Sequence, residues 1–415
     1  MEENTPIRFA DRMSQLPPYL FGMINKMKME KRWQGDDVID LGMGNPIDPA
    51  PGPVTEKLCE VAIDPKTHRY PVAGGMKNLK REIAQYYQRN YRVSLNGESD
   101  VICTIGSKEG ISHMCLALLG PGDTVIVPAP AFPIHVYAAV IAGANVLRIP
   151  LVSEDLFLEQ LVGMCKSLYP GPKLVMLNFP HNPTGRLASK ELFAEVIRYA
   201  RQYNFMVIND FAYAKITFDG YVAPSFLEVE GGRDVGVEFG SFSKSYNMAG
   251  WRLGYCVGNE RIIEGLSRIK GYYDYGIFSA IQIAGIVAMR DCDDDIGEQA
   301  HTYQNRRDVL CDGLVRMGWE VEVPKAGMFL WVKIPEPYAR MGSVRFAVEM
   351  MNRANVAVAP GAGFGEEGDG YLRLALVENE NRIRQALKQM RQSLREIDRE
   401  IENGSFRFEQ EDAQG

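Results

Sequence analysis

The sequence predicts an α/β fold, with a doubly wound, mostly parallel sheet of seven strands and a second, smaller α+β domain. Seven short apolar runs lie between residues 101 and 257, and helix-patterned text separates several of them. This alternation is typical of parallel strands with helices on both faces of the sheet. After residue 295 a long helical pattern and shorter mixed segments indicate the smaller domain. A length of 415 residues is sufficient for both.

The N-terminal segment is expected to form an arm followed by helices. The first fifteen residues are polar, and we expect the arm there. Residues 19–33 have a helical pattern that stops at Gly35. A short apolar run at 38–41 leads into a Gly-Asn-Pro loop, and helical pattern returns at 53–62 and 76–91.

The seven apolar runs are the predicted strands of the main sheet. They cover residues 101–105, 124–127, 145–149, 173–178, 205–209, 235–239 and 252–257, with helical text at 109–119, 134–142 and 189–203. In a doubly wound sheet, ligands bind at the carboxyl ends of the strands. Most of the candidate site residues fall at or just past such ends.

The C-terminal part predicts the smaller domain. We expect helices at 296–317 and near 343–353, and strand-like runs at 320–323, 328–334, 356–359 and 371–377. The last helix carries Ile383, Leu387, Met390, Leu394, Ile397 and Ile401 in alternating steps of four and three. This face fits a coiled coil, but so short a stretch favours packing on its own domain. The predicted limits are 49–295 for the large domain, 1–48 with 296–403 for the small domain and arm, and 404–415 for a disordered tail.

Composition restricts the partners and the compartment. A net charge of −7 gives no support for nucleic acid or an anionic membrane as a partner. The seven cysteines are scattered, which is typical of free thiols in a reducing compartment. Because no basic and then apolar signal opens the chain, a cytoplasmic location is expected. The five histidines lack metal-cluster spacing, and no metal is expected.

A lysine-centred stretch is the main candidate for chemistry. Residues 241–254 read Ser-Phe-Ser-Lys-Ser-Tyr-Asn-Met-Ala-Gly-Trp-Arg-Leu-Gly, and they follow one predicted strand and lead into the next. A lysine beside serines and an arginine suits the covalent attachment of a cofactor whose phosphate the hydroxyls and guanidinium hold. Taken alone, Lys244 is better explained as a solvated loop lysine. Other residues of the chain favour the interpretation that it binds a cofactor.

Six motifs contain these residues. They are Leu-Gly-Met-Gly-Asn-Pro at 41–46, Gly-Ser-Lys-Glu-Gly at 106–110, His-Asn-Pro-Thr-Gly at 181–185, Asp-Phe-Ala-Tyr at 210–213, the lysine stretch, and Tyr-Leu-Arg-Leu at 371–374. With these motifs in this order, the chain resembles the class I/II aminotransferases from about residue 16 to about residue 401. These are pyridoxal-phosphate enzymes of fold type I. The resemblance implies that fold, pyridoxal 5′-phosphate as cofactor, and amino acids and 2-oxo acids as substrates.

The resemblance assigns four residues to the ring of the cofactor. Lys244 would attach it covalently and carry protons. Asp210, which follows the predicted strand 205–209, would keep the ring nitrogen protonated. Tyr213 and Asn182 would hydrogen-bond the ring oxygen. Taken alone, Asp210 also fits a capping or loop residue, and Asn-Pro-Thr-Gly also fits an ordinary turn.

The phosphate and the stacking face are assigned in the same way. The phosphate would be held by the main chain of Ser107 and Lys108 and by Ser241, Ser243 and Arg252. The residues themselves support this, because Gly106-Ser107 opens a predicted helix whose free amides favour an anion. Phe132 matches an aromatic residue that stacks on the ring. The family often has tyrosine there, so a hydrogen bond from this position is in question, and a core aromatic is the alternative.

The substrate and the second subunit complete the implied site. Arg373 matches the arginine that clamps the substrate α-carboxylate with its planar fork, although an arginine in a strand also fits a surface position. Gly44 and Asn182 would lie beside that carboxylate. Tyr70 matches a tyrosine that reaches the phosphate of the neighbouring subunit, which implies a homodimer with sites at the interface.

The resemblance predicts a ping-pong aminotransferase acting on L-alanine, L-glutamate, pyruvate and 2-oxoglutarate. The alternatives are an LL-diaminopimelate aminotransferase, or one acting on another amino acid such as aspartate or methionine. A different fold type I chemistry, such as a C–S lyase or decarboxylase, is a further alternative. A pyridoxal-phosphate-binding regulator is disfavoured, because the roughly fifteen residues before the resemblance are too few for a DNA-binding domain.

Overall fold

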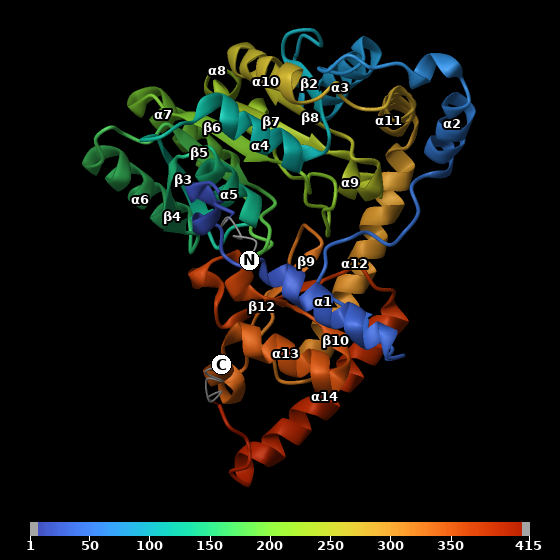
Figure 1. Cartoon of the computed structure of the whole chain (residues 1–415), viewed down its shortest axis with the longest axis vertical. Helices are drawn as coiled ribbons and strands as arrows, with labels where there is room; N and C mark the ends of the chain where they lie inside the picture. The colour runs from blue at the N-terminus through green and yellow to red at the C-terminus, as the bar shows by residue number, and fades with distance from the viewer. Residues whose placement is uncertain (1–6, 409–415) are drawn as a thin grey trace, which may run out of the picture.

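A seven-stranded sheet forms the centre of the larger domain in the computed structural model, which describes residues 7–408 (Figure 1). In sheet order its strands are β2 (Val101–Thr104), β8 (Gly254–Gly258), β7 (Gly236–Ser241), β6 (Met206–Asp210), β5 (Leu174–Asn178), β3 (Thr124–Ala129) and β4 (Asn145–Pro150). Strand β8 pairs antiparallel with β7 and β2, and the other pairs are parallel. The predicted α/β fold with a mostly parallel sheet of seven strands is therefore confirmed.

Helices cover both faces of this sheet. One face packs against α4 (Ser107–Leu118), α5 (Pro133–Ile141) and α10 (Glu260–Tyr273). The other packs against α3 (Lys77–Tyr91), α6 (Glu154–Ser167), α7 (Lys190–Tyr203) and α11 (Ser279–Asp291), with α2 (Gly52–Ala62) beside α11 and the short α8 (Gly232–Val235) before β7. Successive side chains of a strand point to opposite faces, so Val207 and Ile208 of β6 are buried in different cores. Helices α6, α10 and α11 were not assigned from the sequence.

The smaller domain joins segments from both parts of the chain. It contains α1 (Leu20–Trp33), β1 (Ile39–Asp40), α12 (Asp293–Val315), β9 (Phe329–Lys333), α13 (Gly342–Ala354), β10 (Val356–Ala357), β11 (Ala359–Pro360), β12 (Tyr371–Ala375) and α14 (Glu380–Glu402). Strands β11, β12 and β9 form an antiparallel sheet, and β1 pairs parallel with β10. Figure 1 shows α12 running from the sheet domain into this domain, where α1 lies against the C-terminal elements.

The last helix packs on its own domain, as predicted. Ile383, Leu387, Met390, Leu394 and Ile397 of α14 are buried in the core of the smaller domain. The strand expected at 320–323 is wrong: this segment is irregular, and no strand pairs with it in the described chain. Its alternating Glu-Val-Glu-Val pattern fits a strand locally, but a strand also needs a hydrogen-bonded neighbour.

The expected disordered tail is wrong for residues 404–408. Phe406 and Phe408 pack on the core of the smaller domain, and Arg345 donates hydrogen bonds to the carbonyls of residues 407 and 408. The rest of the expected tail, 409–415, lies outside the described residues. The domain limits at 48/49 and 295/296 stay predictions.

The sheet positions the candidate site. Strands β5, β6 and β7 are neighbours, and they end at Asn178, Asp210 and Ser241 on one edge of the sheet. Within residues 7–408, no helix has the length and apolar character needed to cross a membrane.

Candidate active site

A cavity of about 680 Å³ lies at this edge of the sheet and is lined by residues of both domains. The larger domain contributes Ser107, Lys108, Phe132, Asn182, Asp210, Tyr213, Ser241, Ser243, Lys244 and Arg252. The smaller domain contributes Phe21, Gly44, Phe329 and Arg373. The structure thus brings together every candidate residue of the sequence analysis except Tyr70.

One end of the cavity is built to hold an anion. Gly106 has a φ of +76°, and a Cβ there would lie 2.3 Å from Nη2 of Arg252. Glycine therefore provides both the left-handed backbone and the space for the guanidinium. Ser107 is the first residue of α4, where backbone amides lack helical partners and the helix dipole favours negative charge. This end combines a cation with free amides.

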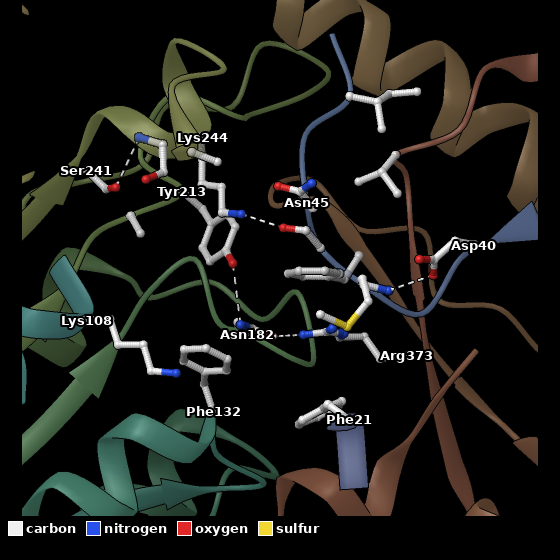
Figure 2. A pocket seen from close by; sticks show the side chains of 18 of the residues that line it. Phe21, Asp40, Asn45, Lys108, Phe132, Asn182, Tyr213, Ser241, Lys244 and Arg373 are labelled. Atoms are coloured by element: carbon white, nitrogen blue, oxygen red, sulfur yellow. Dashed lines mark hydrogen bonds between the residues drawn. The ribbon is translucent and has the colours of Figure 1, made fainter. Parts of the chain in front are cut away.

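Two of the three serines of the lysine stretch, Ser241 and Ser243, line the same cavity. Ser241 ends β7, and its Oγ accepts a hydrogen bond of 3.1 Å from the amide of Ser243 (Figure 2). Residues 242–245 of the stretch form a single helical turn, α9 (Phe242–Ser245), and a short 3-10 turn follows at Ala249–Trp251. The turn places the hydroxyls beside the anion-binding end and Lys244 towards the centre of the cavity.

The Lys244 amine faces the part of the cavity that contains Gly44. Its Nζ donates a hydrogen bond to the carbonyl of Gly44 (Figure 2). Burial, together with the positive charges of Arg373 and Arg252, lowers the pKa of Lys244 to about 7. A substantial fraction of Lys244 is therefore neutral near neutral pH, which is the form that can accept a proton or act as a nucleophile.

Asp210 lines the cavity with a buried carboxylate. It is the last residue of β6 and is 6% exposed. Its Oδ2 lies 2.9 Å from Nε2 of His135 on α5, and its Oδ1 is buried without a hydrogen-bond partner among the described residues. A buried carboxylate oxygen needs a donor, so this atom indicates a ligand with an N–H group at this place.

Arg373, Asn182 and Tyr213 form a connected polar group. Arg373 on β12 donates from Nη1 to Oδ1 of Asn182 at 3.0 Å, and Nδ2 of Asn182 donates to the Tyr213 hydroxyl at 3.4 Å. Burial lowers the pKa of Arg373 to about 10, so the guanidinium remains charged near neutral pH. Burial also raises the pKa of Tyr213, which keeps its hydroxyl protonated as a donor.

The Arg373 guanidinium is held between a carbonyl and aromatic rings. Its Nη2 donates to the carbonyl of Gly42 at 2.9 Å, and it lies 4.0 Å from the centre of the Phe329 ring. Its Nε has no hydrogen-bond partner among the described residues. The same phenylalanine explains the glycine at 44, because a Cβ there would lie 2.5 Å from Cζ of Phe329.

Tyr70 is placed away from the cavity of its own chain. It is 84% exposed, and its ring centre lies 4.8 Å from that of Tyr275. Tyr272 and Tyr273 are also exposed. A single chain therefore leaves Tyr70 free to contact a second molecule, and its role stays a prediction.

Several residues of the site were missed from the sequence. Among them are Asn178, Phe21 and Phe329, which line the cavity, and His135, which contacts Asp210. Asn178 had a signal, since it ends a predicted strand, and its Nδ2 donates to the main-chain oxygen of Asp210 at 2.7 Å. His135 follows Phe132 by one helical turn, but only the fold brings it to a carboxylate 75 residues away.

Comparison with solved structures defines the class of protein. The substrate-bound BacF structure from Bacillus subtilis matches with a TM-score of 0.89 and 30% identity, covering 93% of this chain and 98% of that one. The sheet, the smaller domain and the lysine cavity are those of a fold type I enzyme.

Comparison with sequences defines the family. The model for aminotransferase class I and II matches residues 36–396. The glutamate-pyruvate aminotransferase AlaC of Escherichia coli is 49% identical over 94% of each chain, and an LL-diaminopimelate aminotransferase of Halothermothrix orenii is 41% identical over 92% of this chain and 98% of its own. The chain belongs to the class I and II aminotransferases, which use pyridoxal 5′-phosphate.

The residues present fit this cofactor. The unpartnered Oδ1 of Asp210 matches a ring N–H group, and the Arg252 guanidinium beside the free amides of α4 matches a phosphate. The Lys244 amine opens into the same cavity. All three features that the cofactor requires are therefore supplied by this chain.

Proposed function

We propose that this aminotransferase exchanges amino groups between L-alanine or L-glutamate and pyruvate or 2-oxoglutarate by a ping-pong mechanism. The observation that carries the substrate assignment is the 49% identity to the E. coli glutamate-pyruvate aminotransferase across nearly the full length. The 41% identity to an LL-diaminopimelate aminotransferase supports the second candidate, in which the donor has a longer, charged side chain.

The cofactor end of the site is assigned to residues of the larger domain. When bound, pyridoxal 5′-phosphate supplies a carbonyl carbon that takes up the amino group and a ring that withdraws the charge left at Cα. The Asp210 carboxylate would hold a proton on the ring nitrogen, and His135 would keep that carboxylate oriented. Ser107, Lys108, Ser241, Ser243 and Arg252 would bind the phosphate, the first two through their main chain. Phe132 would stack on the ring and Tyr213 and Asn182 would donate to its oxygen.

The substrate end is assigned to Arg373 and Lys244. Arg373 would bind the α-carboxylate through donors that the chain leaves unused, next to Gly44 and Asn182. This places Cα near Lys244, whose lowered pKa makes the neutral amine available to remove the Cα proton and to return a proton to the cofactor carbon.

We also propose that the enzyme is a homodimer in which Tyr70 completes the site of the neighbouring chain. The support is the exposure of Tyr70, Tyr272, Tyr273 and Tyr275 on one chain. Exposed aromatic side chains in one region are typical of a protein interface.

A single-turnover donor panel tests the substrate assignment. Holoenzyme is mixed with one amino acid at a time, and the change in the cofactor's visible absorbance is followed. L-alanine and L-glutamate are expected to react fastest among alanine, glutamate, aspartate, methionine and LL-diaminopimelate. If LL-diaminopimelate reacts faster than both, the second candidate is correct. If no donor converts the cofactor, the transaminase assignment is wrong.

A further inference from the structure

The turn that carries Gly42 and Gly44 is held by an ion pair between Lys28 and Asp40, and both residues line the cavity. Asp40 ends β1, and its Oδ1 accepts hydrogen bonds from the amides of Gly42 at 2.9 Å and Met43 at 3.1 Å. Its Oδ2 accepts from Lys28 Nζ at 2.6 Å. The exposed fractions of the two side chains are only 9% for Lys28 and 15% for Asp40.

The carbonyls of the same turn contact the two central cations of the site. Gly42 accepts from Arg373 at 2.9 Å, and Gly44 accepts from Lys244. In Figure 2, Asp40 lies above and to the right of Arg373, on the side away from Phe132. The Asp40 carboxylate therefore bonds to the amide side of a turn whose carbonyl side bonds to Arg373. The Met43 amide and the Gly42 carbonyl belong to one planar peptide group, so the hydrogen bond from this amide to Asp40 helps to fix the direction of that carbonyl.

We propose that Lys28 and Asp40 are positioning residues for the substrate carboxylate. Lys28 balances the charge of Asp40, which lets the carboxylate remain buried and fix the turn at residues 40–44. The fixed turn orients Arg373 through the Gly42 carbonyl. Without the ammonium, a largely buried carboxylate is left uncompensated and is expected to turn towards water, releasing the Gly42 and Met43 amides. The inference rests on the proposed role of Arg373.

A neighbouring lysine gives a matched control for a merely structural role. The bond from Lys28 to Asp40 also joins helix α1 to β1 of the smaller domain. Its loss lowers the stability of the fold even if Arg373 is not affected. Lys31 lies on the same helix, and its Nζ donates to Oδ1 of Asn355 at 2.8 Å and to Oδ2 of Asp36 at 3.2 Å. Lys31→Met therefore removes comparable hydrogen bonds between α1 and the smaller domain, while the bonds from the Gly42 and Met43 amides to Asp40 remain.

The decisive variant is the double substitution Lys28→Met/Asp40→Asn. Asparagine keeps an oxygen for the two amides and removes the charge that Lys28 balanced. If positioning of the turn is the role, the double variant is expected to recover carboxylate binding that Lys28→Met loses. If Lys28 acts only by holding α1 in place, the double variant binds carboxylates as weakly as Lys28→Met, because the bond between Lys28 and Asp40 is absent in both.

The test measures binding as well as turnover. Propionate and glutarate carry carboxylates but no amino group, so they bind without reacting, and their Kd for the holoenzyme is measured by calorimetry. Lys28→Met is expected to raise the Kd of propionate and the KM of L-alanine about tenfold, the scale of one hydrogen bond to a charged group, with kcat within about threefold. For the double variant, the Kd of propionate and the KM of L-alanine are expected to lie within about threefold of wild type. For Lys31→Met, both are expected to equal the wild-type values.

The proposal is overturned if Lys31→Met weakens binding as much as Lys28→Met, or if the double variant shows no recovery. Arg373→Gln separates this failure from failure of the proposed site. If Arg373→Gln leaves the Kd of propionate unchanged, the carboxylate does not bind at Arg373, and both the site assignment and the positioning role are wrong. Circular dichroism on every variant verifies that each is folded.

Discussion

Replacing Glu238 with glutamine is predicted to change how stability depends on pH. Glu238 lies on β7 and is fully buried. Its oxygens accept hydrogen bonds from Tyr87 and Ser225 at 2.8 Å and from Asn209 and the Phe226 amide at 2.9 Å. Burial raises the pKa of Glu238 to about 7, although these donors oppose the shift. Glu238→Gln removes the charge and keeps a group of the same shape.

The sign of the effect follows from the direction of the pKa shift. Because the folded-state pKa lies above the ordinary value of 4.5, the folded state binds this proton more tightly than the unfolded state. The stabilisation is complete below pH ~4.5 and is lost as the pH rises through ~7. At about 1.4 kcal/mol per pKa unit, the loss from this group is about 3 kcal/mol. Glutamine does not titrate, and its amide can donate to the two hydroxyls while its oxygen accepts from Asn209 and Phe226.

The assay is urea unfolding of wild type and Glu238→Gln across this pH range, followed by circular dichroism. The free energy of unfolding of the variant relative to wild type is expected to increase by about 3 kcal/mol between pH ~4.5 and ~7.5. Turnover is expected to stay near wild type, since the hydrogen bond to Asn209, next to Asp210, is kept. A difference between the two proteins that is constant across this range would refute the reasoning, because it would mean that Glu238 has the same pKa folded and unfolded.

Four further predictions concern the site. Lys244→Ala is expected to abolish transamination while still binding the cofactor non-covalently. Borohydride reduction of the wild-type holoenzyme, followed by peptide mapping, identifies the lysine that carries the cofactor, and an adduct on another lysine would contradict the assignment. Asp210→Ala is expected to slow Cα proton removal by ~10²-fold or more in single-turnover measurements, the scale of a lost acid–base partner, and near-normal turnover would exclude its role. Gly44→Ala is expected to raise the KM of L-alanine about tenfold or more, since its Cβ would displace Phe329 from Arg373; steady-state kinetics measure this, with unchanged KM as the contrary result. Lys244→Ala and Tyr70→Ala chains refolded together are expected to regain roughly a quarter of wild-type activity, since about half the dimers are mixed and each has one intact site. Activity no higher than the sum of the parents, with mixed dimers shown to form, would rule out sharing of Tyr70.

The fold class could be predicted from the sequence because strands and helices are encoded locally, and much of the candidate site because six short motifs, in order, resemble those of the aminotransferase family. A buried strand is an apolar run of a few residues, and Asp210 directly ends such a run. Parallel strands end on one edge of a sheet, so residues that end different strands, such as Asp210 and Ser241, were expected to meet. Gly106 was assigned to an anion site for an equally local reason, since it precedes the first turn of a helix.

Other features depended on the tertiary structure because they join residues that no local pattern links. His135 contacts Asp210 because α5 packs on one face of the sheet, next to the end of β6. The Phe329 ring leaves no room for a side chain at residue 44, because β9 packs in the same small domain as the 40–44 turn. Lys28 contacts Asp40 because α1 packs in that domain too. The segment 320–323 shows the converse, since its alternating pattern is strand-like but no neighbouring strand pairs with it in the described chain. Local sequence thus determined the elements and the residues at their ends, while contacts between distant segments were decided by packing and register, which depend on all the elements together.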